Sequence, residues 1–267
     1  MRKFENAFLA NVILSLSKDG FKLKQLGCII LSFLILSCNS EDGPDCFKKQ
    51  GDEVSEQIEI EEFSEINISE GIELIVKESE EQSVKLTMGE NLINDIKFEV
   101  IDGELKITNE NGCEMLRNYH PAKIYITTPI LEKIYSSSQY TIKSDGVLTF
   151  PELTLESGII EDTPASVFEM QIENQNLKVN DNISSVFKIS GHSDKLDVSF
   201  WGSNGRFEGG NFIVKEVNVN HRSTNDIIVY PTESVSGVIR STGNLVLKNL
   251  PPVVDVEQLY TGHIVYP

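Results

Sequence analysis

The sequence predicts an all-β protein: a right-handed parallel β-helix, or β-solenoid, with an antiparallel β-rich N-terminal part. Three observations support this fold class. From Glu56 onward, apolar and polar residues alternate along most of the chain, which is the period of a half-buried strand. The same part of the chain shows no amphipathic helix of useful length. In the second half, short apolar triplets recur about every 20 residues, a spacing typical of stacked repeats.

The first half reads as short strands joined by turns. The segments "QIEIEEFSEINIS", "GIELIVKE" and "SVKLTM" alternate apolar and polar residues. Asp102-Gly103 separates two further alternating runs and predicts a hairpin turn. The segment "AKIYITTPI" predicts another strand, ended by Pro129, and residues 91–96 predict one short helical turn.

The triplets of the second half define the repeat. Four copies have the form apolar-x-apolar and a fifth is degenerate: Leu153-Thr-Leu155, Leu177-Lys-Val179, Leu196-Asp-Val198, Val217-Asn-Val219 and Val238-Ile-Arg240. Their starts are separated by 24, 19, 21 and 21 residues. A small polar residue follows four of them: Asn180, Ser199, Asn220 and Ser241.

Stacked rungs explain this pattern, because one rung cannot bury its apolar face alone. Asn and Ser suit the corners of such rungs, since they hydrogen-bond locally and Asn tolerates left-handed backbone. An antiparallel sandwich is the alternative, and spacing alone does not exclude it, because each repeat holds about two strands. The recurring polar residue after each triplet favours the solenoid.

The N-terminus predicts an export signal. Lys22 and Lys24 precede the apolar run Leu26–Leu36, whose 11 residues are too few to cross a bilayer as a helix. The segment Ile35-Leu36-Ser37-Cys38 resembles a bacterial lipoprotein signal, which implies cleavage before Cys38 and acylation of that cysteine. The alternative is that Cys38 lies in the core of an ordinary helix, but no amphipathic period surrounds it. We expect residues 1–37 to be this signal, with the part before Lys22 a spurious extension from a misassigned start.

Residues 38–55 are expected to be a lipidated acidic tether, followed by the solenoid domain over residues 56–267. The segment "NSEDGPD" after Cys38 suits a solvated tether and resembles the acidic signal that sends some Bacteroidetes lipoproteins to the cell surface. A plain periplasm-facing tether is the alternative. The formal charge of −18 falls to −21 without residues 1–37, which argues against a nucleic-acid partner.

The remaining cysteines predict one disulfide. Cys28 leaves with the signal and Cys38 carries lipid, so Cys46 and Cys113 remain in an exported compartment that permits a bond between them. A zinc site is not expected, because His120 is the only histidine near these two thiols.

Enzyme motifs are missing from the sequence, and we expect no catalytic residue, metal or cofactor. His192 and His221 fall near corners of neighbouring rungs, where we expect exposed polar residues. Four acids lie on neighbouring rungs, and a polysaccharide-acting enzyme would need such carboxylates to converge: Asp181, Asp194, Asp197 and Asp226. Solvated surface acids are the expected reading.

Trp201 is the one tryptophan and the candidate ligand-binding residue. It lies in "SFWGSNG", whose small residues favour an exposed loop. An exposed indole can stack on a sugar ring or anchor a protein partner. Tyr119, Tyr135 and Tyr140 can extend an aromatic surface, although core or edge packing is expected for them.

Four segments together resemble the putative auto-transporter adhesin head GIN domain. They are "FSEINISEGIELIVKES", "NLINDIKFEVIDGELKITNENG", "KIYITTPILEKIYSSSQYTIKSDG" and "VIRSTGNLVLKNLPPVVDV". Their order carries the resemblance, which covers residues 56–267. Ser241-Thr242-Gly243-Asn244 departs from the Gly-rich closing motif of the family. The resemblance implies a β-helical, extracytoplasmic and often lipid-anchored protein.

These observations favour a non-enzymatic, lipid-anchored protein of the outer membrane or cell surface that presents a solenoid for adhesion or ligand binding. Its expected partners are the membrane, through the N-terminal lipid, and a glycan or surface protein. The alternatives are a polysaccharide-acting enzyme on a β-helix and a structural envelope component without a ligand.

Overall fold

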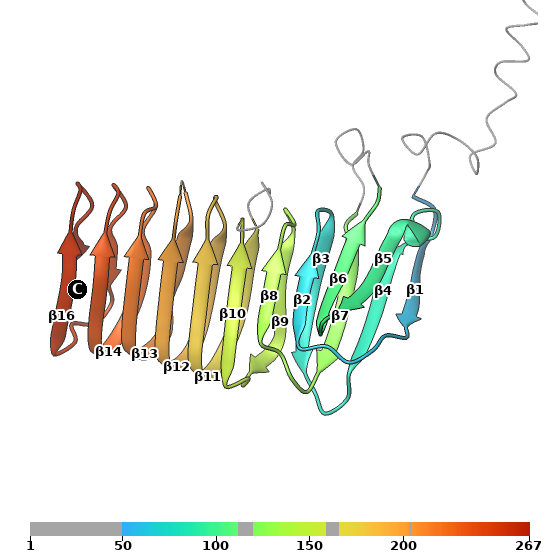
Figure 1. Ribbon diagram of the computed structural model, residues 1–267, viewed down its shortest axis with the longest axis horizontal. Helices are drawn as coiled ribbons and strands as arrows, with labels where there is room; N and C mark the ends of the chain where they lie inside the picture. The colour runs from blue at the N-terminus through green and yellow to red at the C-terminus, as the bar shows by residue number, and fades with distance from the viewer. Residues whose placement is uncertain (1–49, 112–119, 159–165, 203) are drawn as a thin grey trace, which may run out of the picture. The chain divides into compact units, whose positions relative to one another are not determined.

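The computed structural model describes residues 50–111, 120–158, 166–202 and 204–267 (Figure 1). Regular structure in these ranges is almost entirely β, so the predicted all-β class is confirmed. None of the helices within these ranges is long and apolar enough to cross a membrane. The described residues belong to one unit, Gln50–Pro267.

The described ranges contain 17 strands and one short 3-10 helix. In chain order they are β1 (Glu53–Ile58), β2 (Glu65–Ile68), β3 (Ile72–Glu78), β4 (Ser83–Gly89), η2 (Ile93–Asp95), β5 (Ile96–Ile101), β6 (Glu104–Asn109), β7 (Ala122–Thr128), β8 (Lys133–Ser136), β9 (Thr141–Leu148), β10 (Glu152–Ser157), β11 (Val167–Asp181), β12 (Val186–Phe200), β13 (Arg206–His221), β14 (Ile227–Ile239), β15 (Leu245–Leu247), β16 (Val253–Gln258) and β17 (Ile264–Val265). The helix η2 occupies the short turn expected over residues 91–96.

The strands stack into a solenoid of about six turns with two faces (Figure 1). We call the face that contains β6, β2, β8, β10 and β16 the first sheet. The face that contains β7, β3, β9, β15 and β17 is the second sheet. Each of β11 to β14 runs along the second sheet, bends, and continues in the first, so one strand contributes to both faces.

The parallel register confirms the four apolar-x-apolar triplets. Leu153 pairs with Leu177, Leu177 with Leu196, and Leu196 with Val217. All four side chains are buried, with at most 1% of their surface exposed. Because the register is parallel, equivalent residues of successive turns form one inward column, which is the stacking that the repeat predicts.

The predicted fifth triplet is wrong. Val217 pairs with Val235 rather than Val238, and Val238 pairs with Asn220 on the outer side. The position equivalent to Val219 is Gly237, whose φ of 127° is unfavourable for other residues and whose missing Cβ would collide with the carbonyl oxygen of Val219. This turn is therefore shorter and contains no apolar-x-apolar triplet.

The N-terminal part is mixed, as predicted. Strands β1, β4 and β7 pair antiparallel, and so do β5 and β6. Asp102 and Gly103 join β5 to β6 with φ values of 52° and 84°, which is the backbone of a primed hairpin turn. Strands β2 and β3 are sandwiched between β6–β7 on one side and β8–β9 on the other.

The core fills the space between the two sheets. Alternating residues of each strand point inward, and the buried apolar residues are mostly Leu, Ile, Val and Phe. Phe168 and Phe187 stack with ring centroids 4.7 Å apart, and Phe187 and Phe200 follow at 6.1 Å. Phe168 belongs to β11 and the other two rings belong to β12, so this fully buried stack ties two neighbouring turns together and also links the two faces of β12.

Buried polar groups gather at the corner where the chain passes from the first sheet to the second. The hydroxyl of Ser157 donates to the carbonyl of Ser136 at 2.9 Å, and the hydroxyl of Ser166 donates to the carbonyl of Ser138 at 2.7 Å. These hydroxyls donate hydrogen bonds to backbone carbonyls of neighbouring turns. Their hydrogen-bonding needs are therefore met in the interior, away from water.

Candidate functional site: two grooves on opposite sheets

Trp201, Arg222 and Arg240 occupy the same position in three successive turns. Their backbone N–H groups donate to the turn before: Trp201 to Asp181 at 2.9 Å, Arg222 to Phe200 at 3.0 Å, and Arg240 to His221 at 2.8 Å. Each comes directly after an inward residue, so each side chain points out of the solenoid. The stacking of turns therefore places one indole and two guanidinium groups in a row.

These three residues line a groove of about 600 Å³ along the outer side of the first sheet. We call it the tryptophan groove; its lining is Ser199, Trp201, Asn218, Val219, Asn220, Arg222, Gly237, Val238 and Arg240. Trp201 is 53% exposed, which confirms its predicted position in an exposed loop. The predicted polar residues Ser199 and Asn220 lie on the groove, side by side in register.

The tryptophan groove is positively charged on a protein of formal charge −18. Its lining holds Arg222 and Arg240 and no carboxylate. Within the described ranges, neither arginine forms an ion pair. Both guanidinium groups thus remain available to donate hydrogen bonds to a ligand oxygen, while the indole offers a stacking surface.

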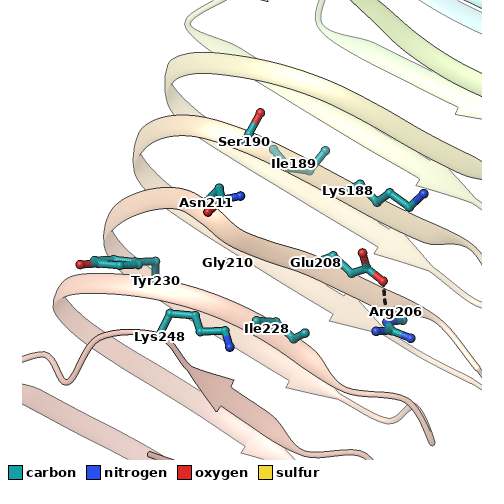
Figure 2. A pocket seen from close by; sticks show the side chains of 10 residues that line it. All are labelled: Lys188, Ile189, Ser190, Arg206, Glu208, Gly210, Asn211, Ile228, Tyr230 and Lys248. Carbon is teal, nitrogen blue, oxygen red and sulfur yellow. Dashed lines mark ion pairs between the residues drawn. The ribbon is translucent and has the colours of Figure 1, made fainter. Parts of the chain in front are cut away.

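A second groove of about 720 Å³ lies on the outer side of the second sheet (Figure 2). It is built around a β-bulge in β13. Lys188 pairs with Glu208 and Ser190 with Asn211, so that Gly209 and Gly210 together face one residue of β12. A bulge bends its strand and redirects neighbouring side chains. Here it opens a hollow in the second sheet, at a point where the register between β13 and β14 also shifts.

We call this hollow the glycine-bulge groove; its lining is Lys188, Ile189, Ser190, Arg206, Glu208, Gly210, Asn211, Ile228, Tyr230 and Lys248. Figure 2 shows Lys188, Glu208 and Arg206 toward one end, and Asn211 and Tyr230 toward the other. Arg206 Nε pairs with Glu208 Oε1 at 2.8 Å. Lys188 Nζ pairs with Glu169 Oε1 at 2.7 Å, and this hydrogen bond raises the pKa of Lys188.

Asp181 and His221 are buried polar groups of the corner column. Asp181 Oδ1 accepts from the backbone N–H of Ser185 at 3.4 Å, and Oδ2 has no hydrogen-bond partner in the described part of the chain. Burial raises the pKa of Asp181 to about 6. His221 Nε2 lies 3.2 Å from the carbonyl of Asn244, and burial lowers the pKa of His221. Phe200 occupies the turn between them, so the two groups do not meet.

The expectation that both histidines are exposed is therefore wrong for His221 and right for His192. His221 is fully buried because its position in the column faces inward, where its edge packs against Phe200 at 6.5 Å between ring centroids. His192 is exposed at the opposite corner, 3.8 Å from Glu173. The two imidazoles do not approach each other, since they lie in different columns.

The structure does not bring the four candidate acids together. Asp181 is buried in the core, and Asp194 pairs with Lys215 at 2.6 Å. Asp197 accepts from the side chain of Asn218 at 3.0 Å, and Asp226 accepts from the backbone N–H of Asn244 at 2.9 Å. Each thus has a separate structural setting. In the described ranges, no group of three or more His, Cys, Asp or Glu side chains is placed to hold a metal ion.

Other predicted residues have simpler outcomes. Cys38, Cys46 and Cys113 lie outside the described residues, so the lipidation site and the disulfide stay predictions, and Tyr119 also lies outside. Tyr135 is 1% exposed and packs in the core, as expected.

The sequence analysis missed the partners of Trp201 and the second groove. Arg222 and Arg240 follow Trp201 at the spacing of the repeat, so counting turns from the tryptophan would have found them. The Gly209-Gly210 pair inside an alternating strand was the available signal for a bulge.

The comparisons with known proteins agree with this fold. The family model described as "Putative auto-transporter adhesin, head GIN domain" matches residues 62–251. A comparison with curated proteins returns no significant match.

Solved structures of similar fold cover about four-fifths of the chain. A putative adhesin from Bacteroides fragilis is 20% identical with a TM-score of 0.73, and the match covers 81% of this chain and 97% of that one. A putative adhesin from Parabacteroides merdae is 15% identical with a TM-score of 0.60, covering 81% and 97%. A putative lipid binding protein from Parabacteroides distasonis is 17% identical with a TM-score of 0.56, covering 80% and 97%. At these identities the likeness establishes the fold alone.

Proposed function

Because this chain belongs to the putative auto-transporter adhesin family with a head GIN domain, we propose that it is a non-enzymatic, lipid-anchored protein of the cell envelope that binds a glycan through the tryptophan groove. The observation that carries the proposal is the row of Trp201, Arg222 and Arg240 along one open groove.

The chemistry of the groove suits a sugar chain. An exposed indole packs against the apolar face of a sugar ring, and the guanidinium groups and the Asn218 and Asn220 amides offer hydrogen bonds to ring substituents. The groove is open and crosses several turns, which suits an extended partner more than a small enclosed ligand.

The experiment is a glycan array with the chain from residue 39 to residue 267, together with its Trp201→Ala variant. We expect saturable binding to at least one glycan, weakened at least about tenfold in the variant because the stacking surface is gone. Tyr260→Ala is the matched control, since Tyr260 is 63% exposed and lies outside the groove. Absence of glycan binding, or equal loss in the control, would refute the glycan-binding proposal.

The anchoring has its own test. Cys38 is proposed to carry the lipid that holds the protein at the outer membrane or cell surface, with residues 39–49 as the solvated tether, because strand β1 already begins at Glu53. Cells that express the full chain are labelled with a fatty-acid analogue and fractionated. We expect label and membrane association in the wild type and neither in Cys38→Ser. Equal labelling of both proteins would contradict the assignment of Cys38.

A further inference from the structure

The glycine-bulge groove holds an excess of positive charge on an acidic protein. Its lining contains Lys188, Arg206 and Lys248 against one carboxylate, Glu208. Glu208 forms an ion pair with Arg206, and Lys188 forms one with Glu169, which is not part of the lining. No residue of the described ranges forms an ion pair with Lys248. Lys248 is therefore the cation that a ligand can engage without breaking an existing pair.

The bulge brings Lys248 over the floor of the groove. A Cβ built on Gly210 would lie 3.7 Å from both Cγ and Cε of Lys248 and 3.8 Å from Cγ2 of Ile228. The lysine stem thus crosses from its own turn, over the turn of β14, to the bulge in β13. Because Gly210 has no side chain, the space beside that stem stays empty and forms the concavity.

The other lining groups are suited to sugar hydroxyls. Tyr230, Asn211 and Ser190 provide an aromatic ring, an amide and a hydroxyl toward the end of the groove that holds Tyr230 (Figure 2). A dense polyanion such as nucleic acid is disfavoured, because the groove offers few cations and the formal charge of the whole chain is −18. One anionic group on an otherwise neutral sugar unit fits this lining best.

We propose that the glycine-bulge groove is a second glycan-binding site, selective for a sugar unit that carries a carboxylate or a sulfate. Lys248 binds the anionic group, and Tyr230, Asn211 and Ser190 contact the sugar ring. The site lies on the opposite sheet from the tryptophan groove, so it is independent of that groove and of the glycan-binding function proposed for it.

The test titrates the chain from residue 39 to residue 267, which includes the whole unit Gln50–Pro267, with three defined oligosaccharides. They are an oligogalacturonate, a κ-carrageenan oligosaccharide, whose only anionic groups are sulfates, and a neutral malto-oligosaccharide. Amide shifts are followed by NMR. We expect the shifts of Ser190, Asn211 and Tyr230 to saturate with one or both acidic probes and not with the neutral one. The two acidic arms separate carboxylate from sulfate recognition.

Two variants test the site, one by removing a charge and the other by filling the groove. Lys248→Met removes the free cation, and we expect it to weaken acidic-probe binding roughly tenfold, as the loss of one hydrogen bond to a charged group does. Gly210→Val fills the floor. Gly210 has no positive φ and the new Cβ would make only ordinary van der Waals contacts, so the variant should fold, and its thermal unfolding midpoint checks this.

Two further variants serve as controls. Lys215→Met removes an exposed lysine that lines neither groove and should leave binding unchanged. Trp201→Ala should leave the shifts of the second-sheet residues unchanged, which separates failure of this proposal from failure of the proposed function. No saturating shift at the glycine-bulge groove with either acidic probe, or full binding in both Lys248→Met and Gly210→Val, would overturn the proposal.

Discussion

The parallel turns from β11 to β14 and the antiparallel N-terminal strands differ in what their register builds. In the parallel turns the same position recurs in each turn, so residues collect into columns such as Leu177, Leu196 and Val217 inside. Outside, the same rule aligns Trp201, Arg222 and Arg240. In the hairpin of β5 and β6 the two strands run in opposite directions, so residues pair across the turn and the same position does not recur between these strands. Both grooves described above lie on the parallel turns: the aligned positions build the tryptophan groove, and a bulge within one of these turns builds the glycine-bulge groove.

The sharpest contrast concerns two glycines. Gly237→Ala in β14 should destabilise the protein by more than about 3 kcal/mol, because a Cβ there would collide with the carbonyl of Val219 at a φ of 127°. Gly103→Ala in the hairpin should cost only about 1 kcal/mol, since a Cβ there meets nothing within 4 Å. Urea unfolding of both variants measures the difference. Equal costs would show that turn stacking imposes no special demand at Gly237.

The aromatic stack gives the next contrast. Phe187→Ala should cost about 3–5 kcal/mol, because Phe187 is fully buried between Phe168 and Phe200 and a cavity would remain. Phe98→Ala in the antiparallel β5 should cost roughly 1–2 kcal/mol, since Phe98 is only partly buried at the margin of the core. Thermal unfolding of both variants checks the order. A larger loss in Phe98→Ala would contradict the view that the stack ties the turns together.

The buried carboxyl group of Asp181 makes the stability of the protein depend on pH. Its pKa is raised from 3.8 to about 6, so the folded protein binds a proton more tightly than the unfolded chain and loses stability as pH rises from about 4 to 6. Asp181→Asn should therefore stabilise the protein by about 2 kcal/mol at pH 7 and change little at pH 4. Urea unfolding at both pH values tests this, and equal effects at the two values would contradict it.

His221 lies in the same column as Asp181 and has the opposite effect on how stability changes with pH. Burial lowers its pKa, so its contribution is fully present above the ordinary value of 6.5 and is lost as pH falls below that value. In the Asp181→Asn variant, stability should thus fall as pH is lowered from 7 toward 5, without the opposing gain from Asp181. If stability rises over that range, the placement of His221 as a neutral, buried imidazole is wrong.

The smallest effect on stability is expected at the outer column. Trp201→Ala should change the free energy of unfolding by less than about 0.5 kcal/mol, because the indole is 53% exposed. Thermal unfolding of the variant checks this value. A large loss would mean that Trp201 is a packing residue, which would remove the main support for the tryptophan groove.

The sequence by itself determined the all-β class, the turn length and four of the five triplets. Strand alternation and repeat spacing can be recognised from the order of residues alone. It also identified the Asp102-Gly103 turn and the exposed position of Trp201, since both depend on local residues. The acidic composition disfavours a nucleic-acid partner, but it does not indicate where positive charge gathers.

Only the tertiary structure decided which residues meet across turns. The pairing of Val217 with Val235 rather than Val238, the burial of His221 and the bulge at Gly209-Gly210 each depend on how one turn is aligned with the next. A change of one residue in that alignment moves a side chain from the interior to the surface, and residue order alone does not fix it. For the same reason the row of Trp201, Arg222 and Arg240 exists only once the turns are stacked.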